Sequence, residues 1–203
     1  MTTTTYPNGQ TLTSTALTIQ QINILIQTLT CGMLGINPVD PSQVRVDWQP
    51  QGQPDVALPS DDSCYISCVL QDTPYSRVRD RSYAGIDVST ETWVYTRGWR
   101  IAWEAYGPSA FDRMRQVHSA LFIDYFNDQL ALQGNLYPVL DPAEPTRMPT
   151  NHNAQWYDRS DFRIEMYEQV TETIQYPVVA SLEIKVYDGS PDDPVADIIL
   201  TKT

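Results

Sequence analysis

The sequence predicts an α+β fold: a single domain with a mixed, mostly antiparallel β-sheet of long strands, packed by two or three helices. Residues 92–106 alternate between apolar and polar side chains, which is the period of a β-strand. Residues 15–34 and 110–121 have the period of amphipathic helices, and Gly107-Pro108 separates the second helix from the strand. Because 203 residues are enough for one well-buried core, residues 15–203 are assigned to one domain.

Residues 1–14 precede this domain and are predicted to form a flexible N-terminal arm. They are rich in threonine and contain the turn signal Pro7-Asn8-Gly9. Two interpretations stay open for this segment. It is either a disordered terminus or an arm that becomes ordered against a neighbouring subunit or a partner ring.

The first helix, expected over 15–34, buries one apolar stripe. Serine and threonine side chains among residues 14–18 can cap its start, because a hydroxyl oxygen there accepts from an unpaired N–H group of the first turn. Gly32 or Gly35 can end it. The stripe consists of Ile22, Leu25, Ile26, Leu29 and Met33.

Two shorter strands are predicted next, over Val44–Trp48 and Cys64–Leu70, with a proline-rich loop over 49–62 between them. An irregular segment with alternating arginines follows, and if it is extended these side chains point the same way. In a chain with a net charge of −12, the arginines either guard an exposed sheet edge or contact a neighbouring subunit or a phosphate group. They are Arg77, Arg79 and Arg81.

The central strand and the helix after it are the clearest elements of the sequence. Ser109 with Asp112 resembles a capping box that opens the helix, which continues to Leu132 with a bend near 122–124. Gly134-Asn135 ends it. The strand places Trp93, Tyr95, Trp99, Ile101, Trp103 and Ala105 on one face, and the helix stripe is Ala110, Met114, Val117 and Leu121.

The last third of the chain is predicted to contain a loop over 141–154 and then a β-hairpin. Loops of this length without regular period often bind partners. The hairpin joins the strand 156–170, with Trp156 and Phe162 on one face, to the alternating positions 178–186. Residues 195–203 can add an edge strand, on this chain or on a neighbour.

Motifs for catalysis are missing from the sequence. It has no glycine-rich phosphate loop, no G-x-S-x-G elbow and no His-x-x-x-His pair, and its three cysteines and two histidines lack metal-site spacing. We therefore predict no enzyme activity, no cofactor and no metal. The sequence also lacks an apolar run long enough for a membrane span, and the charge of −12 argues against a surface that wraps DNA.

Two stretches carry a resemblance to a known family. The run Trp-Arg-Ile-x-Trp-x-Ala-Tyr-Gly-Pro-x-Ala over 99–110 and the run Gln-Trp-Tyr-Asp-Arg-Ser-Asp-Phe over 155–162 resemble neck or tail-terminator (tail-completion) proteins of long-tailed bacteriophages and prophages. The resemblance covers about residues 64–188.

This resemblance implies a structural virion protein of the neck or tail, assembled in the host cytoplasm. Such a subunit forms a ring, commonly a hexamer, that terminates the tail tube and joins it to the head-side connector. Its partners are then itself, the tail tube protein and the connector, while DNA passes through the lumen without specific binding. Two alternatives stay open: another tail component, such as a tube or baseplate subunit, or a small cytosolic enzyme or ligand-binding domain.

Candidate contacts with other subunits are chosen among arginines, an exposed-loop methionine and a tryptophan, because such residues dominate interface energetics. The arginines of the central strand and the hairpin can instead pair with Glu104 and Glu165 across strands of one subunit, and this alternative stays open. The candidates are Arg77, Arg79, Arg81, Arg97, Arg100, Met148, Trp156, Arg159 and Arg163.

Overall fold

The structure, a computed structural model, describes residues 1–36, 42–46, 62–84, 89–139, 141–152, 154–177, 181–187 and 194–201. Within these residues a nine-stranded sheet has the order β1-β2-β11-β6-β4-β3, with β5 paired to β6 and with β7 and β8 paired to β11. Its pairs are antiparallel except for the parallel pair β3–β4. The predicted α+β fold with a mixed, mostly antiparallel sheet is confirmed. The strands are β1 (Thr2–Thr5), β2 (Thr11–Ser14), β3 (Val44–Val46), β4 (Ser63–Gln71), β5 (Asp80–Ala84), β6 (Thr90–Tyr106), β7 (Leu136–Pro138), β8 (Thr146–Arg147) and β11 (Arg159–Gln175).

The two longest strands, β6 and β11, determine the shape of the molecule. Each has 17 residues, and they pair along their whole length from Tyr106 opposite Arg159 to Thr90 opposite Gln175. Strands of this length span about 56 Å. The strand predicted over 92–106 is therefore confirmed, and its apolar face is the buried one.

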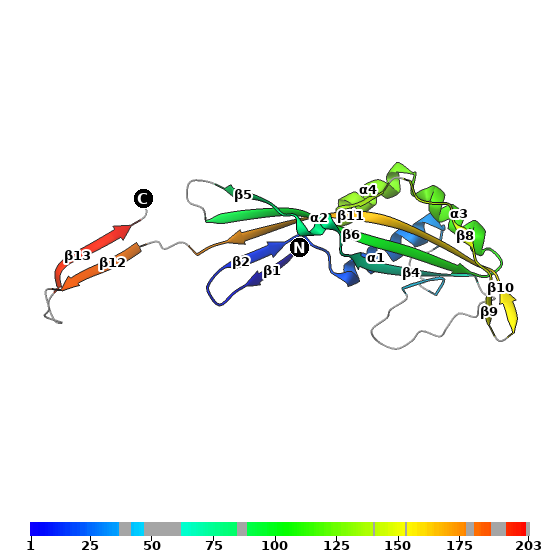
Figure 1. Ribbon diagram of the computed structural model, residues 1–203, viewed down its shortest axis with the longest axis horizontal. Helices are drawn as coiled ribbons and strands as arrows, with labels where there is room; N and C mark the ends of the chain where they lie inside the picture. Colours follow the sequence, from blue (N-terminus) through cyan, green and yellow to red (C-terminus); the bar gives the residue numbers. More distant parts are fainter. Residues whose placement is uncertain are drawn as a thin grey trace.

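Three helices cover one face of the sheet at one end of this long pair (Figure 1): α1 (Ile19–Met33), α3 (Ala110–Ala120) and α4 (Asp124–Gly134). The core lies between them and the sheet. At its centre Trp103 stacks on Phe162 with 5.4 Å between ring centroids, and the Trp103 indole N–H donates to the Thr30 hydroxyl at 2.9 Å. Other core residues are Ile22, Leu25, Ile26, Leu29, Met33, Trp99, Ile101, Ala105, Ala110, Met114, Val117, Leu121 and Leu130.

The helix ends follow from local sequence. Thr18 and Gln21 form a capping box at the start of α1, each side chain accepting from the backbone N–H of the other. Gly35, with a φ of 65°, closes α1: its N–H donates to the Gly32 carbonyl and the Ile36 N–H donates to the Cys31 carbonyl. At the start of α3 the predicted capping box is wrong. The Ser109 side chain makes no capping bond, and its backbone N–H donates to Asp62 instead.

The bend predicted near 122–124 separates α3 from α4, and Asn135 in the left-handed conformation ends α4 as expected. A fourth, short helix, α2 (Pro74–Arg77), lies in the segment that was predicted to be irregular.

Three parts of the sequence prediction differ from the structure. Residues 1–14, predicted as an arm, contain the hairpin β1–β2, and β2 pairs with β11. The predicted loop 141–154 contains β8 and β9 (Thr150–His152), and β9 pairs with β10 (Gln155–Tyr157). The predicted hairpin between residues 156–170 and 178–186 is not formed, because β11 pairs with β6 and β2 whereas β12 (Ser181–Tyr187) pairs with β13 (Pro194–Thr201).

Candidate functional site

The end of the sheet that lies away from α1, α3 and α4 is termed the arm here. It consists of β1, β2, β5, residues 90–98 of β6 and residues 167–175 of β11 (Figure 1). On the face that continues the core, charged and aromatic side chains replace the apolar ones, beginning with Arg97 opposite Glu168. The arm therefore depends on polar contacts where the rest of the sheet depends on apolar packing.

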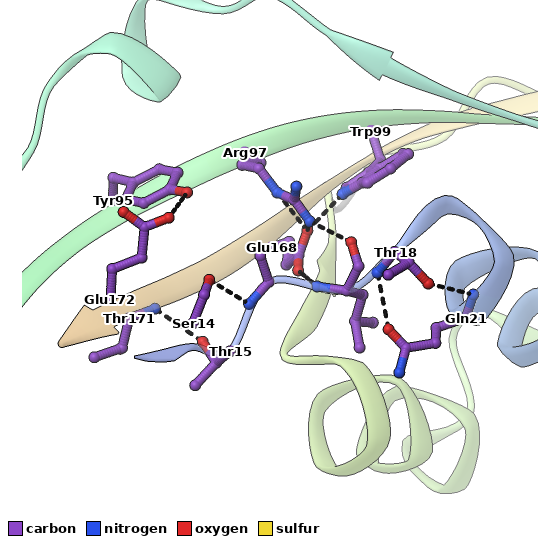
Figure 2. Close-up of polar contacts among 12 residues, drawn as sticks. Ser14, Thr15, Thr18, Gln21, Tyr95, Arg97, Trp99, Glu168, Thr171 and Glu172 are labelled. Carbon is purple, nitrogen blue, oxygen red and sulfur yellow. Dashed lines mark hydrogen bonds and ion pairs between the residues drawn. The ribbon is translucent and has the colours of Figure 1, made fainter. Parts of the chain in front are cut away.

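Glu168 forms the centre of the first polar cluster (Figure 2). This side chain is fully buried, and its Oε2 atom accepts from the Arg97 Nε at 2.9 Å, the Arg97 Nη2 at 2.6 Å and the Trp99 Nε1 at 2.8 Å. Its Oε1 atom accepts from the Leu17 N–H at 2.8 Å, while Arg97 donates to the Leu17 carbonyl. The cluster fixes the link between β2 and α1 to the two long strands, at the boundary between the helices and the arm.

The segment that links β2 to α1, residues 15–18, is also hydrogen-bonded to β11. The Thr15 N–H donates to the Thr171 carbonyl, and the Thr171 N–H donates to the Thr15 hydroxyl at 2.9 Å. Both bonds lie next to the Glu168 cluster, as Figure 2 shows for the hydroxyl bond. The β2 strand is thus held by side chains as well as by its backbone ladder.

A second cluster surrounds Glu172 in the middle of the arm. Its carboxylate accepts from the Tyr95 hydroxyl at 2.8 Å and from the Arg79 Nη1 at 2.7 Å. The Arg79 guanidinium lies 4.2 Å from the centroid of the Tyr95 ring, within the range of a cation–π contact. Arg79 therefore ties the segment before β5 to β6 and β11.

A third cluster surrounds Glu91 near the end of the arm. The Glu91 carboxylate accepts from the Trp93 indole N–H at 2.6 Å and from the Tyr176 hydroxyl at 2.7 Å, and the Arg81 Nε lies 3.9 Å away. These hydrogen bonds, that from Trp93 first, lower the pKa of Glu91 below its usual range. In all three clusters the carboxylate finds its hydrogen-bond donors within the same chain, so these contacts stabilise the arm.

Two tyrosines, Tyr95 in the Glu172 cluster and Tyr106 beside Glu104, predict a loss of stability in alkaline solution. Burial, with Glu172 nearby, raises the pKa of Tyr95 to about 12, and burial with Glu104 nearby raises the pKa of Tyr106 to about 12. An unfolded tyrosine loses its proton near about pH 10. Between these values the folded chain binds more protons than the unfolded chain, so the free energy of unfolding falls as pH rises from about 10 to 12. Urea unfolding at a series of pH values will measure this slope.

The variants Tyr95→Phe and Tyr106→Phe show which groups cause the free energy of unfolding to fall at alkaline pH. Each removes one ionisable group and is expected to flatten the decline, and the double variant is expected to flatten it more. A slope in the double variant equal to that of the wild type would contradict the assignment.

The face of the sheet opposite the core carries a groove between the long strands and residues 141–148. Two adjoining hollows of about 360 and 420 Å³ share Arg100, Arg163 and Ala143, and Met148 lines one of them. Among the residues that the structure describes, neither Arg100 nor Arg163 forms an ion pair, although the Gln71 amide can accept from Arg100. The groove thus brings three of the predicted contact residues together, and its lining is of mixed charge, because five carboxylates, Glu104, Asp141, Glu144, Asp161 and Glu165, line it as well.

Of the cross-strand pairs expected from the sequence, one is confirmed. Arg159 Nη2 lies 3.1 Å from the Glu104 Oε1, and Arg159 also donates to Asp161. Arg97 pairs with Glu168, which was not predicted as its partner. Arg159 and Arg97 are therefore engaged inside the subunit.

The three arginines at alternating positions, Arg77, Arg79 and Arg81, do not lie in one row in the structure. Arg77 ends α2 and pairs with Asp72, and both side chains are exposed. Arg79 and Arg81 turn towards the Trp93 ring of β6, at 5.2 and 5.0 Å from its centroid. The interpretation of three arginines in one extended row is wrong, because Pro74 starts a helical turn that includes the first of them.

At the end of the molecule opposite the arm, the small hairpin β9–β10 projects from the sheet (Figure 1). Its Trp156 side chain is 73% exposed, and nearby Met148 is 50% exposed. The prediction that Trp156 shares one strand face with Phe162 is wrong, because β10 ends at Tyr157 and belongs to a different sheet from β11. Both residues remain candidate partner contacts.

The carboxylates of the three clusters were missed by the sequence analysis. A signal was present for two of them, since Glu168 and Glu172 alternate with Met166, Val170 and Ile174 on the otherwise apolar side of β11. A carboxylate at such a position requires a partner. The partner could not be named without the pairing of β11 with β6, which sets Arg97 opposite Glu168.

The arrangement does not indicate catalysis. In the described part of the chain, His, Cys, Asp and Glu side chains do not gather in threes around a possible metal position. The helices found there are too short or too polar to cross a membrane. The groups with shifted pKa values lie in strand-to-strand contacts or in the exposed Asp72–Arg77 pair, and burial together with these contacts accounts for the shifts.

A comparison with protein families identifies the chain. A family model described as phage neck terminator protein matches residues 20–193, and this range contains both stretches that carry the resemblance noted above. No curated protein matches the chain. The prediction that the chain is not an enzyme agrees with this structural family. Since the match covers most of its length, the chain belongs to the phage neck terminator protein family.

Proposed function

We propose that copies of this chain close into a ring, of six subunits as the resemblance implies, that ends the tail tube and joins it to the head-side connector in the virion. Membership of the neck terminator family supports a place at the neck, where tail and connector are the available partners. The arm is the observation that best supports a ring. It contains nine residues of β6 and nine of β11, and it extends past the helices of its own subunit (Figure 1).

Large apolar side chains are exposed at both ends of the molecule and on its helices. Isolated exposed apolar residues are normal, but groups of them rimmed by polar residues mark interfaces. Tyrosine and tryptophan are enriched in such groups. The side chains are Tyr75, Val78 and Tyr83 beside the arm, Phe122, Tyr125 and Leu132 at α4, and Trp156 at the β9–β10 hairpin.

The groove holding Arg100, Arg163 and Met148 is the proposed contact for a partner surface of mixed charge, which can pair with these arginines and with the carboxylates that also line the groove. Its two arginines are exposed, are not ion-paired among the described residues and lie on adjacent strands. Mutation of such a charge at an interface slows association and changes its salt dependence. Arg100 and Arg163 are thus better contact candidates than Arg97 and Arg159, which have partners within the subunit.

The net charge of −12 supports a lumen through which DNA passes without adhering. The ring is expected to show no tight, salt-sensitive binding to duplex DNA. Tight binding that weakens steeply with added salt would contradict this part of the proposal, because such binding requires clustered basic side chains.

Light scattering over a concentration series, with electron micrographs of each sample, tests the ring. We expect discrete rings, either alone or when purified tail tubes are added to the subunit. Open filaments would support a tube subunit, and a strict monomer that ignores tail tubes would contradict a terminator.

A surface variant separates tube binding from folding. Trp156→Ala removes an exposed ring from the β9–β10 hairpin, so it should leave the unfolding midpoint unchanged while weakening a contact to the tube or to a neighbouring subunit. Ile24→Ala, also exposed but on α1 and outside the surfaces proposed as contacts, is the matched control.

A further inference from the structure

The arm has two free edges, one on each side of its five strands. The strands lie in the order β1-β2-β11-β6-β5, and among the described strands β1 pairs only with β2 and β5 only with β6. Figure 1 shows β1 and β5 on opposite sides of the two long strands. Every residue of both edge strands is exposed. Because an edge strand presents unpaired N–H and C=O groups, the arm can add a strand on either side.

The side chains of the two edges do not oppose such pairing. Proteins usually block a free edge with charged side chains, proline or a bulge. β1 consists of four threonines, a residue that favours strands. β5 carries one acidic and one basic residue, Asp80 and Arg81, and the Arg81 guanidinium lies 5.0 Å from the centroid of the Trp93 ring of its own sheet. Two chains of net charge −12 can therefore approach each other along these edges without like-charge repulsion there.

The hydrogen-bonding pattern shows which groups of β1 point outwards. In an antiparallel pair, residues that exchange backbone bonds alternate with residues that do not. The Tyr6 N–H donates to the Gln10 carbonyl at the turn of the hairpin. By alternation Thr4 bonds to β2, whereas Thr3 and Thr5 direct their N–H and C=O groups to the free edge. The Thr3 hydroxyl lies 3.5 Å from the hydroxyl opposite it on β2, as expected of a pair without backbone bonds, in which side chains lie closer.

The same alternation identifies the outward groups of β5. The Tyr176 N–H donates to the Ser89 carbonyl, just beyond the paired ends of β11 and β6. The next residue of β6, Thr90, therefore directs its backbone groups to β5, where it lies opposite Ala84. Two residues of β5 then present their N–H and C=O groups at the free edge. They are Arg81 and Tyr83.

The two edges lie level with each other and run in the same direction. Following the register across the five strands places Thr3 in one row with Ser82. Since each strand of the arm is antiparallel to the next, the first and the fifth run the same way. Copies related by rotation about an axis along the strands keep this direction, so β1 of one copy meets β5 of the next as a parallel pair. The row consists of Thr3, Thr13, Thr173, Thr92 and Ser82.

We propose that β1 of one copy pairs in parallel with β5 of the next copy, with Thr3 beside Ser82. This inference rests on the proposed ring, and it names the contact that closes it. In a parallel pair, a residue bonds to the residues before and after its partner. Thr3 thus donates to the Arg81 carbonyl and accepts from the Tyr83 N–H, which are the groups that the free edge of β5 presents. In the closed ring no arm keeps a free edge.

Proline substitutions at the outward positions test the contact by sedimentation over a concentration series. Thr3→Pro and Tyr83→Pro each remove an N–H group that points away from the subunit's own sheet, so each should weaken subunit association by about tenfold or more. Thr3→Val and Tyr83→Phe keep the N–H group and should leave association within about threefold of the wild type. Thermal unfolding of every variant checks that the fold is kept, and substitutions on two different strands make the test independent of the β1–β2 hairpin.

Chemical cross-linking shows whether the two edges meet. One copy carries Thr3→Cys, the other carries Ser82→Cys with a heavy-isotope label, and the concentrated mixture is treated with a short bismaleimide. A link between position 3 of a light chain and position 82 of a heavy chain is expected. Within one copy these positions are four strand spacings apart, about 19 Å, which the reagent does not span.

The neighbouring position provides the control for the cross-link. Tyr83→Cys lies on the opposite face of the strand, so it should link to Thr3→Cys several-fold less than Ser82→Cys does. A link between two copies of Thr3→Cys would show that β1 pairs with itself about a two-fold axis, which closes a dimer instead of a ring. That result, or the absence of a link at position 82, would overturn the proposal.

The outcomes separate this inference from the proposed function. Rings that persist with Thr3→Pro and Tyr83→Pro would overturn the edge contact and leave the terminator ring standing. A wild type that forms no rings and ignores tail tubes would contradict the ring, while the cross-linking of concentrated protein still decides whether β1 and β5 of two copies pair.

Discussion

Replacing Glu168 by alanine is expected to destabilise the fold by about 3–5 kcal/mol. The substitution leaves the largely buried Arg97 guanidinium without its ion-pair partner, at a site where the Leu17 and Trp99 N–H groups also lose their acceptor. For a chain of this length, that loss lowers the melting temperature by about 6–20 °C. Urea unfolding followed by tryptophan fluorescence measures it.

A double substitution provides the control for Glu168. Arg97→Met alone should also be strongly destabilising, because it leaves the buried carboxylate unpaired. Glu168→Leu combined with Arg97→Met removes both charges and is expected to lose much less than the sum of the two single variants. Additive losses, or a loss below about 1 kcal/mol in Glu168→Ala, would show that the cluster does not stabilise the fold as an ion pair.

Trp103→Ala is expected to cost about 3–5 kcal/mol through the cavity that it leaves. Trp103 is 1% exposed, stacks on Phe162 and bonds to Thr30 of α1, so its ring connects the sheet to the helix layer. Denaturant unfolding at neutral pH measures the loss.

Trp103→Phe is the matched variant. It keeps a ring against Phe162 and removes the indole N–H, while the Thr30 hydroxyl keeps its bond to the Ile26 carbonyl. The loss should therefore be well below that of Trp103→Ala, at about 1–3 kcal/mol. Equal losses in the two variants would mean that the hydrogen bond outweighs the packing of the ring.

The sequence was sufficient to predict elements whose side chains show a clear period. The alternation of large apolar residues marks β6, and the stripe that includes Ile22 and Met33 marks α1, since in both the buried face is apolar along its length. Strand β2 has no such face, because Thr11–Ser14 is mostly hydroxyl residues and is held by backbone bonds to β11. A polar segment of this kind resembles a flexible arm until its pairing is known.

Strand partners were the part of the fold that periodicity could not supply. Alternation predicted a strand over 178–186, and the described part of that range lies in β12, but the alternation gave no information on whether β11 or β13 lies beside it. The same limit applies to the polar clusters. Glu168 and Arg97 are 71 residues apart in the sequence, and only the register of β6 with β11 places them together.

The position of β11 has a consequence for how the protein is made. Two of its partners in the sheet, β2 and β6, are synthesised long before it, and β2 pairs with residues about 160 positions later in the chain. While β11 is still in the ribosome, the Leu17 N–H before α1 lacks its acceptor Glu168, and the apolar stripe of α1 lacks part of its cover. Folding of the nascent chain therefore waits for its last quarter, and a subunit shortened before β11 lacks the strand on which β2, β6, β7 and β8 pair.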